Sequence, residues 1–327
     1  MLNEKWWGAA RALETRVVGA GGDGVREAAG VLRDGGCVGV PTETVYGLAA
    51  DALSAHACSG IFEAKGRPLS DPLIVHVPEV GWLDRLTEVD ELGQRLAEAF
   101  WPGPLTLVLP RRGEVPDIVT AGQVTVAVRM SAHPVMAAVL AEFGGPVAAP
   151  SANRFGRISP TTAAHVAAEL GGRIPLIVDG GACEHGIEST IVAVADGAIT
   201  VLRAGPVTAE RLREFAPIRG AGTGDVPVVP GAMKSHYAPA TRLELVESAA
   251  EMGDPDTAVL LFRPRELTGY GAVEVLAPTG DLREAAANLY GAMRRLDESG
   301  AKRMVAEIVP GDGIAAAIRE RMGKAAA

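Results

Sequence analysis

The sequence predicts an α/β protein with two units joined by a linker, and three observations support this fold class. From residue 15 to about residue 206, short apolar runs of strand length alternate with helical patterns. Residues 216–240 are rich in Gly, Pro and Ala and show no sustained hydrophobic period, which is typical of a linker. Regular alternation returns at Thr241. We therefore expect a first domain at 1–206, a linker at 207–240 and a second domain at 241–327.

Composition narrows the class of protein. The 327 residues are 48% apolar, and 31 basic against 40 acidic side chains give a net charge of −9. This balance argues against coating of nucleic acid by charge alone, although a local basic cleft stays possible. Three unpaired cysteines indicate reduced thiols. No apolar run has the length of a membrane span and no signal peptide is recognisable, so we expect a soluble, cytoplasmic protein.

The first strand and helix contain a weak nucleotide-binding string. Residues 15–18 read as a strand and 25–33 as a helix, and Gly19, Gly21 and Gly24 between them match GxGxxG. Glycines are frequent on both sides of this string. We therefore favour a structural interpretation, in which they turn the chain and cap the helix.

A group of polar residues follows the next buried strand. Residues 37–40 are apolar, and Pro41 ends the run because proline cannot continue a central strand. Thr42, Glu43 and Thr44 come next, at a strand end, where α/β folds place their ligand contacts.

A basic loop is predicted a little further along. Residues 59–64 read as a helix and 73–77 as a strand, with Lys65 and Arg67 on the loop between them. Two fixed cations at a sheet edge suit a polyphosphate or a carboxylate, and a solvated loop is the alternative.

Arg129 is the next candidate. Residues 80–100 show a helical pattern, and 105–109 and 124–130 read as strands. In the second of these, Arg129 lies on the face opposite the valines, and a buried arginine needs an anion as partner. That partner is either a structural carboxylate or an anionic ligand, and the sequence leaves both open.

The rest of the first domain contributes further hydroxyls and one cation. The strand at 146–150 leads to Ser151 and Asn153, and its small residues allow close approach of a ligand. Ser159 is expected to cap a helix that Gly171 ends. Strands at 174–178 and 199–202 frame Glu188, Ser189 and Thr190 and lead to Arg203, and Thr208 caps a helix through residue 215.

In the linker, Lys234, His236 and Tyr237 are conspicuous and suggest a segment that folds onto a site. The second domain has no evident catalytic cluster, and its charges read as an ordinary solvated surface. Its predicted strands are 243–246, 258–262, 272–276 and 304–308, and its predicted helices are 282–297 and 314–324.

Several common catalytic patterns are missing from the chain. It contains no P-loop, HExxH, CxxC or GxSxG string, and its histidines do not cluster at metal-ligand spacing. What remains are hydroxyls and cations at strand ends, without an obvious base beside any hydroxyl. This set favours binding and aligning an anion, as in phosphoryl or nucleotidyl transfer.

Five strings in order carry a resemblance to a known family: PTETVYGL, Lys65-Gly66-Arg67, PGPLT, Ser151-Ala152-Asn153 and GIESTIV. Together they resemble the Sua5/YrdC/YciO family, and HYAP with the α/β tail resembles its longer, two-domain form. The resemblance implies an open, twisted mixed sheet with helices around a basic cavity. It also implies a linker that covers the site and a small Rossmann-like α/β domain.

The resemblance further implies L-threonylcarbamoyladenylate synthase activity, a nucleotidyl transfer. Such enzymes use L-threonine, bicarbonate or CO₂, and ATP with Mg²⁺, and they release pyrophosphate. The product passes to a tRNA threonylcarbamoyl transferase complex, which modifies adenosine 37. Whether tRNA contacts this chain directly stays open, as does any metal-binding residue.

The family pattern assigns residues to two ligands. Lys65 and Arg67 are the catalytic candidates. The ATP set comprises Lys65, Arg67, Asp71, Thr125, Ser151, Asn153, Ser159, Arg203, His236 and Tyr237. The L-threonine set comprises Thr42, Thr44, His76, Arg129 and Ser189. Asp71 departs from the asparagine often found there, and an acid repels triphosphate unless Mg²⁺ or Arg67 intervenes.

Two alternatives are weighed beside this function. One is a non-catalytic RNA-binding module, which the net charge and the lack of an aromatic-basic stripe disfavour. The other is a different carbamoyl-nucleotide task, as in hydrogenase-maturation carbamoyltransferases, for which the expected zinc-finger segments are missing. We also expect Lys65→Ala to abolish turnover and to leave the fold intact, because Lys65 is predicted to lie on a loop.

Overall fold

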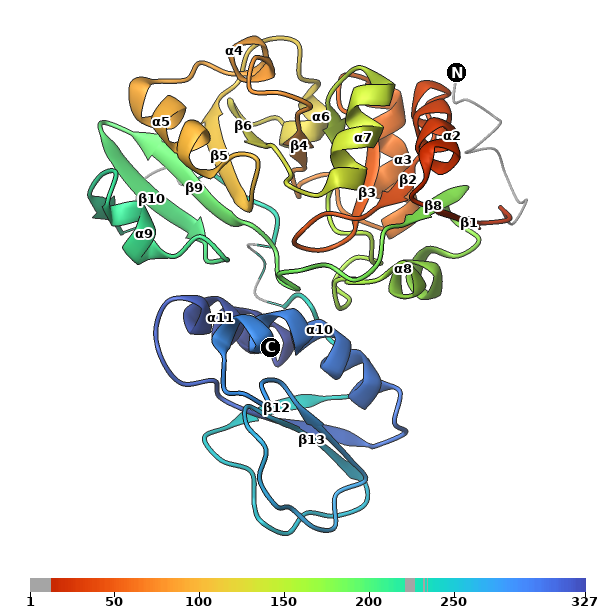
Figure 1. Cartoon of the computed structure of the whole chain (residues 1–327), viewed down its shortest axis with the longest axis vertical. Coiled ribbons are helices and arrows are strands. Elements are labelled where there is room, and N and C mark those ends of the chain that lie inside the picture. The colour runs from red at the N-terminus through yellow and green to blue at the C-terminus, as the bar shows by residue number, and fades with distance from the viewer. Residues whose placement is uncertain (1–12, 221–226, 232, 234) are drawn as a thin grey trace.

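The computed structural model describes residues 13–220, 227–231, 233 and 235–327. Figure 1 shows a larger N-terminal body and a smaller C-terminal one, joined by the linker that crosses between them. None of the described helices is both long and apolar enough to cross a bilayer.

The described part of the N-terminal body contains a mixed sheet with helices around it. The sheet order is β1-β8-β2-β3-β7-β4-β6-β5-β9-β10-β11. Its strands are β1 (Arg16–Gly19), β2 (Val38–Val40), β3 (Gly47–Asp51), β4 (Ile74–His76), β5 (Leu105–Pro110), β6 (Thr125–Arg129), β7 (Val147–Ala148), β8 (Leu176–Asp179), β9 (Thr190–Ala195), β10 (Ala198–Arg203) and β11 (Ile218–Arg219). The helices are α2 (Gly22–Arg33), α3 (Ala55–Lys65), α4 (Trp82–Leu86), α5 (Glu91–Phe100), α6 (Asp117–Thr120), α7 (Pro134–Phe143), α8 (Ala163–Leu170) and α9 (Ala209–Arg213).

One face of this sheet is covered differently along its width. Over β1, β8, β2 and β3, the helices α2 and α7 pack on apolar side chains such as Val38 and Val178. Over β4, β6, β5 and β9, the apolar side chains Ile74, Ala127 and Ile191 pack instead on Val229 of the linker. The candidate site lies on this second half of the face, which the linker covers in place of a helix.

Strand direction brings the site residues together. β4 and β6 are parallel neighbours, with His76 in register with Arg129. β2 is antiparallel to β3, β3 to β7 and β7 to β4, so the β2–β3 turn leaves the sheet at the edge opposite to the carboxyl ends of β4 and β6. Thr44 on this turn nevertheless contacts Arg129, so the turn folds back over the face of the sheet. Carboxyl ends of parallel strands meet at one edge, which is where α/β folds bind ligands.

The C-terminal body is a parallel four-stranded sheet in the order β12-β15-β13-β14. Its two helices pack on one face of the sheet, and Figure 1 shows them between the sheet and the N-terminal body. This confirms the predicted strands and helices to within about two residues. The elements are β12 (Leu243–Val246), β13 (Thr257–Leu261), β14 (Ala272–Val275), β15 (Arg303–Glu307), α10 (Leu282–Asp297) and α11 (Ile314–Ala325).

Some local predictions were wrong. The helical pattern at 80–100 forms two helices, α4 and α5, instead of one. Thr162, not Ser159, caps α8, because its hydroxyl accepts from the backbone N–H of His165. Lys65 is the last residue of α3 and not part of the loop, which begins where Gly66 adopts a left-handed conformation. The helix predicted after Thr208 is present as α9, and it belongs with β11 to the first body although both fall inside the range predicted as linker.

Candidate functional site

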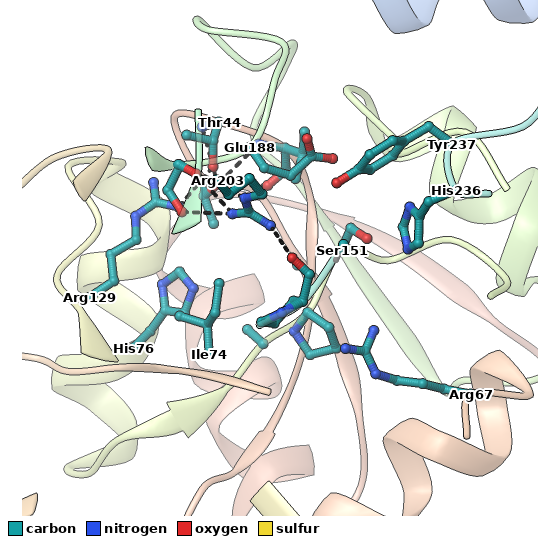
Figure 2. Close-up of a pocket in the computed structure, with 18 residues that line it drawn as sticks. Thr44, Arg67, Ile74, His76, Arg129, Ser151, Glu188, Arg203, His236 and Tyr237 are labelled. Atoms are coloured by element: carbon teal, nitrogen blue, oxygen red, sulfur yellow. Dashed lines mark hydrogen bonds between the residues drawn. The ribbon is translucent and has the colours of Figure 1, made fainter. Parts of the chain in front are cut away.

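A cavity at the edge of β4 and β6 gathers most of the predicted site residues. Figure 2 shows Arg129, His76 and Thr44 on one side of it and Arg67, His236 and Tyr237 on the other. Ten of the fifteen predicted residues line it. These are Thr42, Thr44, Arg67, His76, Arg129, Ser151, Ser189, Arg203, His236 and Tyr237.

The cavity has little free space in this structure. Its free space is about 40 Å³, room for only a few water molecules. The linker residues Pro230, Gly231, His236 and Tyr237 form part of its wall. A nucleotide therefore enters only if part of this wall moves.

Arg129 is buried at the end of the cavity that Thr44 and His76 line, and it has three partners. Its Nη2 lies 2.5 Å from Glu43 Oε1, its Nη1 donates to Thr44 Oγ1 at 3.0 Å, and its Nε donates to the Gly103 carbonyl at 3.2 Å. Ser131 donates to the other oxygen of Glu43. Burial raises the pKa of Glu43, but Arg129 and the Ser131 hydrogen bond lower it to about 2. The carboxylate partner of Arg129 in this structure is thus Glu43.

The hydroxyls of Thr42 and Thr44 form a short chain of hydrogen bonds beside Arg129. Thr42 Oγ1 lies 2.8 Å from Thr44 Oγ1 and donates to the Val45 carbonyl at 2.6 Å. The backbone N–H groups of Thr44 and Val45 both donate back to Thr42 Oγ1. This turn fixes Thr42 through the backbone and leaves Thr44 as the hydroxyl in contact with Arg129.

His76 is a buried neutral histidine. It lies next to Arg129 across the β4–β6 ladder, and its Nδ1 has no hydrogen-bond partner among the described residues. Burial, and then the charge of Arg129, lower the pKa of His76 to about 3. A neutral imidazole with a free nitrogen can bond to a ligand without repelling Arg129.

The histidines predict how stability depends on pH. Because the folded-state pKa values of His76 and His236 are about 3 and the unfolded value is about 6.5, the unfolded chain binds more protons below pH 6.5. We expect the free energy of unfolding to have its full value above about pH 6.5. It should fall as the pH is lowered toward 4.5, by up to about 1.4 kcal/mol per pH unit for each histidine. Urea unfolding across this range measures the slope. His76→Gln should reduce it, and an unchanged slope would contradict the assignment.

Ser189 and Arg203 close the wall between the two ends of the cavity. Arg203 donates from Nε and Nη2 to the Ser189 carbonyl, from Nη2 to Ser189 Oγ at 3.0 Å, and from Nη1 to the Pro230 carbonyl at 3.1 Å. Ser189 Oγ also lies 2.8 Å from Thr106 Oγ1. Arg203 thus connects the linker to Ser189, the residue immediately before β9.

Lys65 lies behind the wall of the cavity and supports it. Its side chain is buried, and Nζ donates to the carbonyl of Ser151 at 2.6 Å and to that of Asn153. Burial, and then Arg67, lower the pKa of Lys65 well below its usual value, while Asp71 and Glu169 oppose this shift. Asn153 adds to the loop by donating to the carbonyls of Arg154 and Arg157.

Asp71 is held by the neighbouring arginine. Asp71 Oδ1 lies 3.0 Å from Arg67 Nη2, and Arg67 also donates to the carbonyls of Asp71 and Pro72. The other oxygen, Oδ2, is buried and has no hydrogen-bond partner among the described residues. Arg67 therefore neutralises the acid that departs from the family pattern.

His236 and Tyr237 cover the cavity from the linker. Their ring centroids are 4.1 Å apart, and Tyr237 stacks on Tyr290 of α10 at 5.6 Å. Tyr237 has a φ of 62°, a left-handed conformation that is uncommon for a tyrosine. A Cβ on Gly231 would lie 2.5 Å from the Tyr237 hydroxyl, so only glycine fits there. Lys234, also noted in the sequence, lies outside the described residues.

Five predicted residues do not line the cavity. Lys65, Asp71 and Asn153 support its wall, as described above. Ser159 is buried and donates to Glu188 Oε1 at 2.6 Å. Thr125 is half-buried at the start of β6, opposite Pro110 and near Gln123, which binds the backbone of Val228 in the linker.

The sequence analysis did not identify the buried charged residues that the C-terminal domain contributes to the surroundings of the cavity. Arg321 is fully buried and Arg294 is 8% exposed, so the expectation that the charges of this domain form a solvated surface was wrong for both. Glu188, which lines the cavity, was noticed but given no role. The signal for Arg321 was its position between Ile318 and Met322, on the apolar face of α11.

No group of three or more His, Cys, Asp or Glu among the described residues could hold a metal ion by itself. A divalent ion that arrives with phosphates needs only one or two protein carboxylates. The unpartnered Oδ2 of Asp71 is such a group, and it lies behind the wall of the cavity rather than in its lining.

Comparison with known proteins identifies similar chains. Residues 30–205 match the family model Sua5_yciO_yrdC, described as "Telomere recombination". Residues 207–327 match the model Sua5_C, described as "Threonylcarbamoyl-AMP synthase, C-terminal domain".

Full-length relatives agree with both matches. The chain is 40% identical to the threonylcarbamoyl-AMP synthase of Bacillus subtilis over 92% of each chain. It is 38% identical to that of Pyrococcus abyssi over 92% of this chain and 93% of the relative. A crystal structure of P. abyssi Sua5 complexed with L-threonine superposes with a TM-score of 0.85 at 35% identity, covering 95% of this chain and 97% of that one.

Proposed function

This chain belongs to the Sua5/YciO/YrdC family, and from that premise we infer that it is a threonylcarbamoyl-AMP synthase acting in tRNA modification. The observation that supports this function most strongly is the single cavity with two chemically different ends. One end has Arg129, Thr44 and His76, and the other has Arg67, Ser151 and the linker pair His236 and Tyr237.

We propose that the first end binds L-threonine, which is also the ligand of the solved P. abyssi relative. The Arg129 guanidinium and the hydroxyls of Thr42, Thr44 and Ser189 suit a carboxylate and a hydroxyl, and neutral His76 offers one more hydrogen bond. Glu43 holds Arg129 in place, so the guanidinium is oriented before a ligand arrives.

We propose that the second end binds ATP. Arg67 and Arg203 line it, and Lys65 holds the Ser151–Asn153 loop from behind. Mg²⁺ bound to ATP would be held by the phosphates and by Asp71, and it would supply neutralisation of phosphate charge. Asp71 then stabilises both Arg67 and the ion.

The proposed reaction is a carbamoylation followed by nucleotidyl transfer. The amine of threonine attacks the carbon of bicarbonate, and loss of water leaves a carbamate. A carbamate oxygen then forms a bond to the α-phosphorus of ATP, and the bond to the β-bridging oxygen breaks to release pyrophosphate. Arg67 would stabilise the charge on that leaving group, and Lys65 would hold the loop that shapes this end of the cavity from behind. Glu43 is ion-paired with Arg129, and Glu188 is held by Arg321, Tyr290 and Ser159. Both have pKa values of about 2, so neither serves as a general base.

Pyrophosphate release tests the function. We expect release from ATP to require both L-threonine and bicarbonate, with threonylcarbamoyl-AMP as the product detected by mass spectrometry. Release without threonine would favour a different carbamoyl-nucleotide activity. No release under any condition would favour the RNA-binding alternative.

We propose the cytoplasm as the site of action, and a tRNA threonylcarbamoyl transferase complex as the acceptor of the product.

A further inference from the structure

Glu188 places a negative charge in a cavity that must accept anions. It lines the cavity next to Ser189, and its side chain is 8% exposed. A carboxylate at this place repels both the triphosphate and the threonine carboxylate unless another charge cancels it. The source of that cancelling charge is therefore important for the site.

The countercharge comes from the C-terminal domain. Arg321 of α11 is fully buried, and its Nε lies 2.8 Å from Glu188 Oε2. Tyr290 of α10 donates its hydroxyl to the same carboxylate, at 2.9 Å to Oε2 and 3.2 Å to Oε1. Ser159 occupies the remaining position on Oε1. Two of the three side chains that hold Glu188 thus belong to the other domain.

Arg321 also supports the adjacent parts of the wall. Its Nη2 donates to the carbonyl of Ala204, the residue after Arg203, at 2.9 Å. Its guanidinium lies 5.5 Å from the ring centroid of Tyr237. On the same helix, Lys324 donates to the Gly231 carbonyl at 2.6 Å, and its own carbonyl accepts from the His236 N–H. One face of α11 therefore contacts Glu188, the Arg203 strand and the linker cover.

We infer that Arg321 is a positioning residue for the proposed reaction. Arg321 cancels the charge of Glu188, so the nucleotide end of the cavity accepts ATP only when the C-terminal domain is docked. This inference rests on the proposed function. It assigns the C-terminal domain an electrostatic part in the site.

The charged and titratable groups around Glu188 agree with this role. Those that face it are Arg321, Tyr290, Arg203, Tyr237 and His236. Burial raises the pKa of Glu188, and Arg321, followed by Arg203 and the Ser159 hydrogen bond, lowers it to about 2. Without Arg321, Glu188 is either an uncompensated buried charge or takes up a proton.

Three variants test the inference: Arg321→Met, Glu188→Gln and the double variant. We expect Arg321→Met to raise the KM for ATP at least 10-fold. Adding Glu188→Gln should return this KM to within about 3-fold of the wild-type value, because the uncompensated charge is gone. Arg319→Met is the matched control. Arg319 lies on the same helix, and the partners of its side chain in the described part of the chain are the Val309 and Gly311 carbonyls of its own domain. Less than a 2-fold change is therefore expected.

A pH series separates this role from a merely structural one. In Arg321→Met, the KM for ATP should improve as the pH is lowered from about 8 to about 6, because Glu188 then takes up a proton. In the wild type and in the double variant this improvement should be absent. A double variant as impaired as Arg321→Met, or a KM of Arg321→Met that matches wild type, overturns the inference.

Two further measurements keep the result interpretable. ATP binding by calorimetry does not depend on turnover, so it tests the inference even if the wild type makes no threonylcarbamoyl-AMP, which would instead contradict the proposed function. If Arg321→Met does not fold, Arg321→Lys keeps the positive charge and loses the bond to Ala204. A KM of Arg321→Lys within about 3-fold of wild type supports charge compensation, and a 10-fold or larger rise overturns it.

Discussion

Replacing Lys65 with alanine is expected to lower kcat/KM for ATP by roughly 10²–10³-fold, the effect of removing one preorganised donor or cation from a reacting phosphate. The Lys65 ammonium donates to the carbonyls of Ser151 and Asn153. Its loss removes a charge from the nucleotide end and releases the loop that shapes it. Pyrophosphate release at varied ATP concentration measures the change.

The structure revises one part of the earlier expectation for this variant. Because Lys65 is buried at the end of α3, alanine leaves two buried carbonyls without their donor, at about 1–3 kcal/mol each. We therefore expect a lower melting temperature in addition to lost activity. Lys65→Met keeps most of the side-chain volume and should melt closer to the wild type, yet be equally inactive.

The control for Lys65 is an exposed cation nearby. Arg173 is exposed, and among the described residues its side chain makes one hydrogen bond, to the Ala64 carbonyl at 3.4 Å. Arg173→Ala should change kcat/KM by less than about 2-fold, because an exposed charge is screened by solvent. Activity of Lys65→Ala near the wild-type level would show that the cation has no part in the reaction.

Replacing Arg129 with methionine is expected to raise the KM for L-threonine at least about 100-fold, because one charge-assisted hydrogen-bonding group and its orientation of Thr44 are lost together. The same change leaves Glu43 buried without a countercharge. Breaking a buried pair in this way costs about 3–5 kcal/mol of the free energy of unfolding. Initial rates and urea unfolding measure the two effects separately.

A double variant separates binding from stability at Arg129. Adding Glu43→Gln removes the unpaired charge, so most of the lost stability should return while the KM for threonine stays high. The exposed pair Arg295–Glu274 serves as a control for ion pairs in general, and Arg295→Met should cost less than about 1 kcal/mol. If the Arg129/Glu43 double variant recovered threonine binding as well, the role of Arg129 would be structural alone.

This pair of variants also addresses an alternative that the sequence leaves open. A buried arginine on a strand needs an anion, and the pattern at 124–130 does not say which. The structure provides a structural carboxylate, Glu43, 86 positions earlier in the chain. The two interpretations are compatible, because Arg129 also contacts Thr44 and lines the cavity.

Local patterns determined most elements of the fold. The helix α10 begins and ends at the predicted residues. Its amphipathic pattern extends over 16 residues and follows the capping residue Asp281, and both features can be recognised in the sequence itself. Predictions that depended on distant partners were less accurate. Ser159 resembles a helix cap in sequence, but its hydroxyl bonds to Glu188 across 29 positions, and Thr162 caps α8 instead.

The sequence by itself determined the two α/β domains, the family and the polar residues at the strand ends, since these follow from hydrophobic periodicity and from short contiguous strings. Only the tertiary structure decided which charges neutralise each other. Arg129 with Glu43, Arg67 with Asp71, and Arg321 with Glu188 are buried pairs, and two of them join residues far apart in the chain. The physical reason is that a buried charge requires a counterion nearby in space, and spacing along the chain does not specify which of many opposite charges will be there.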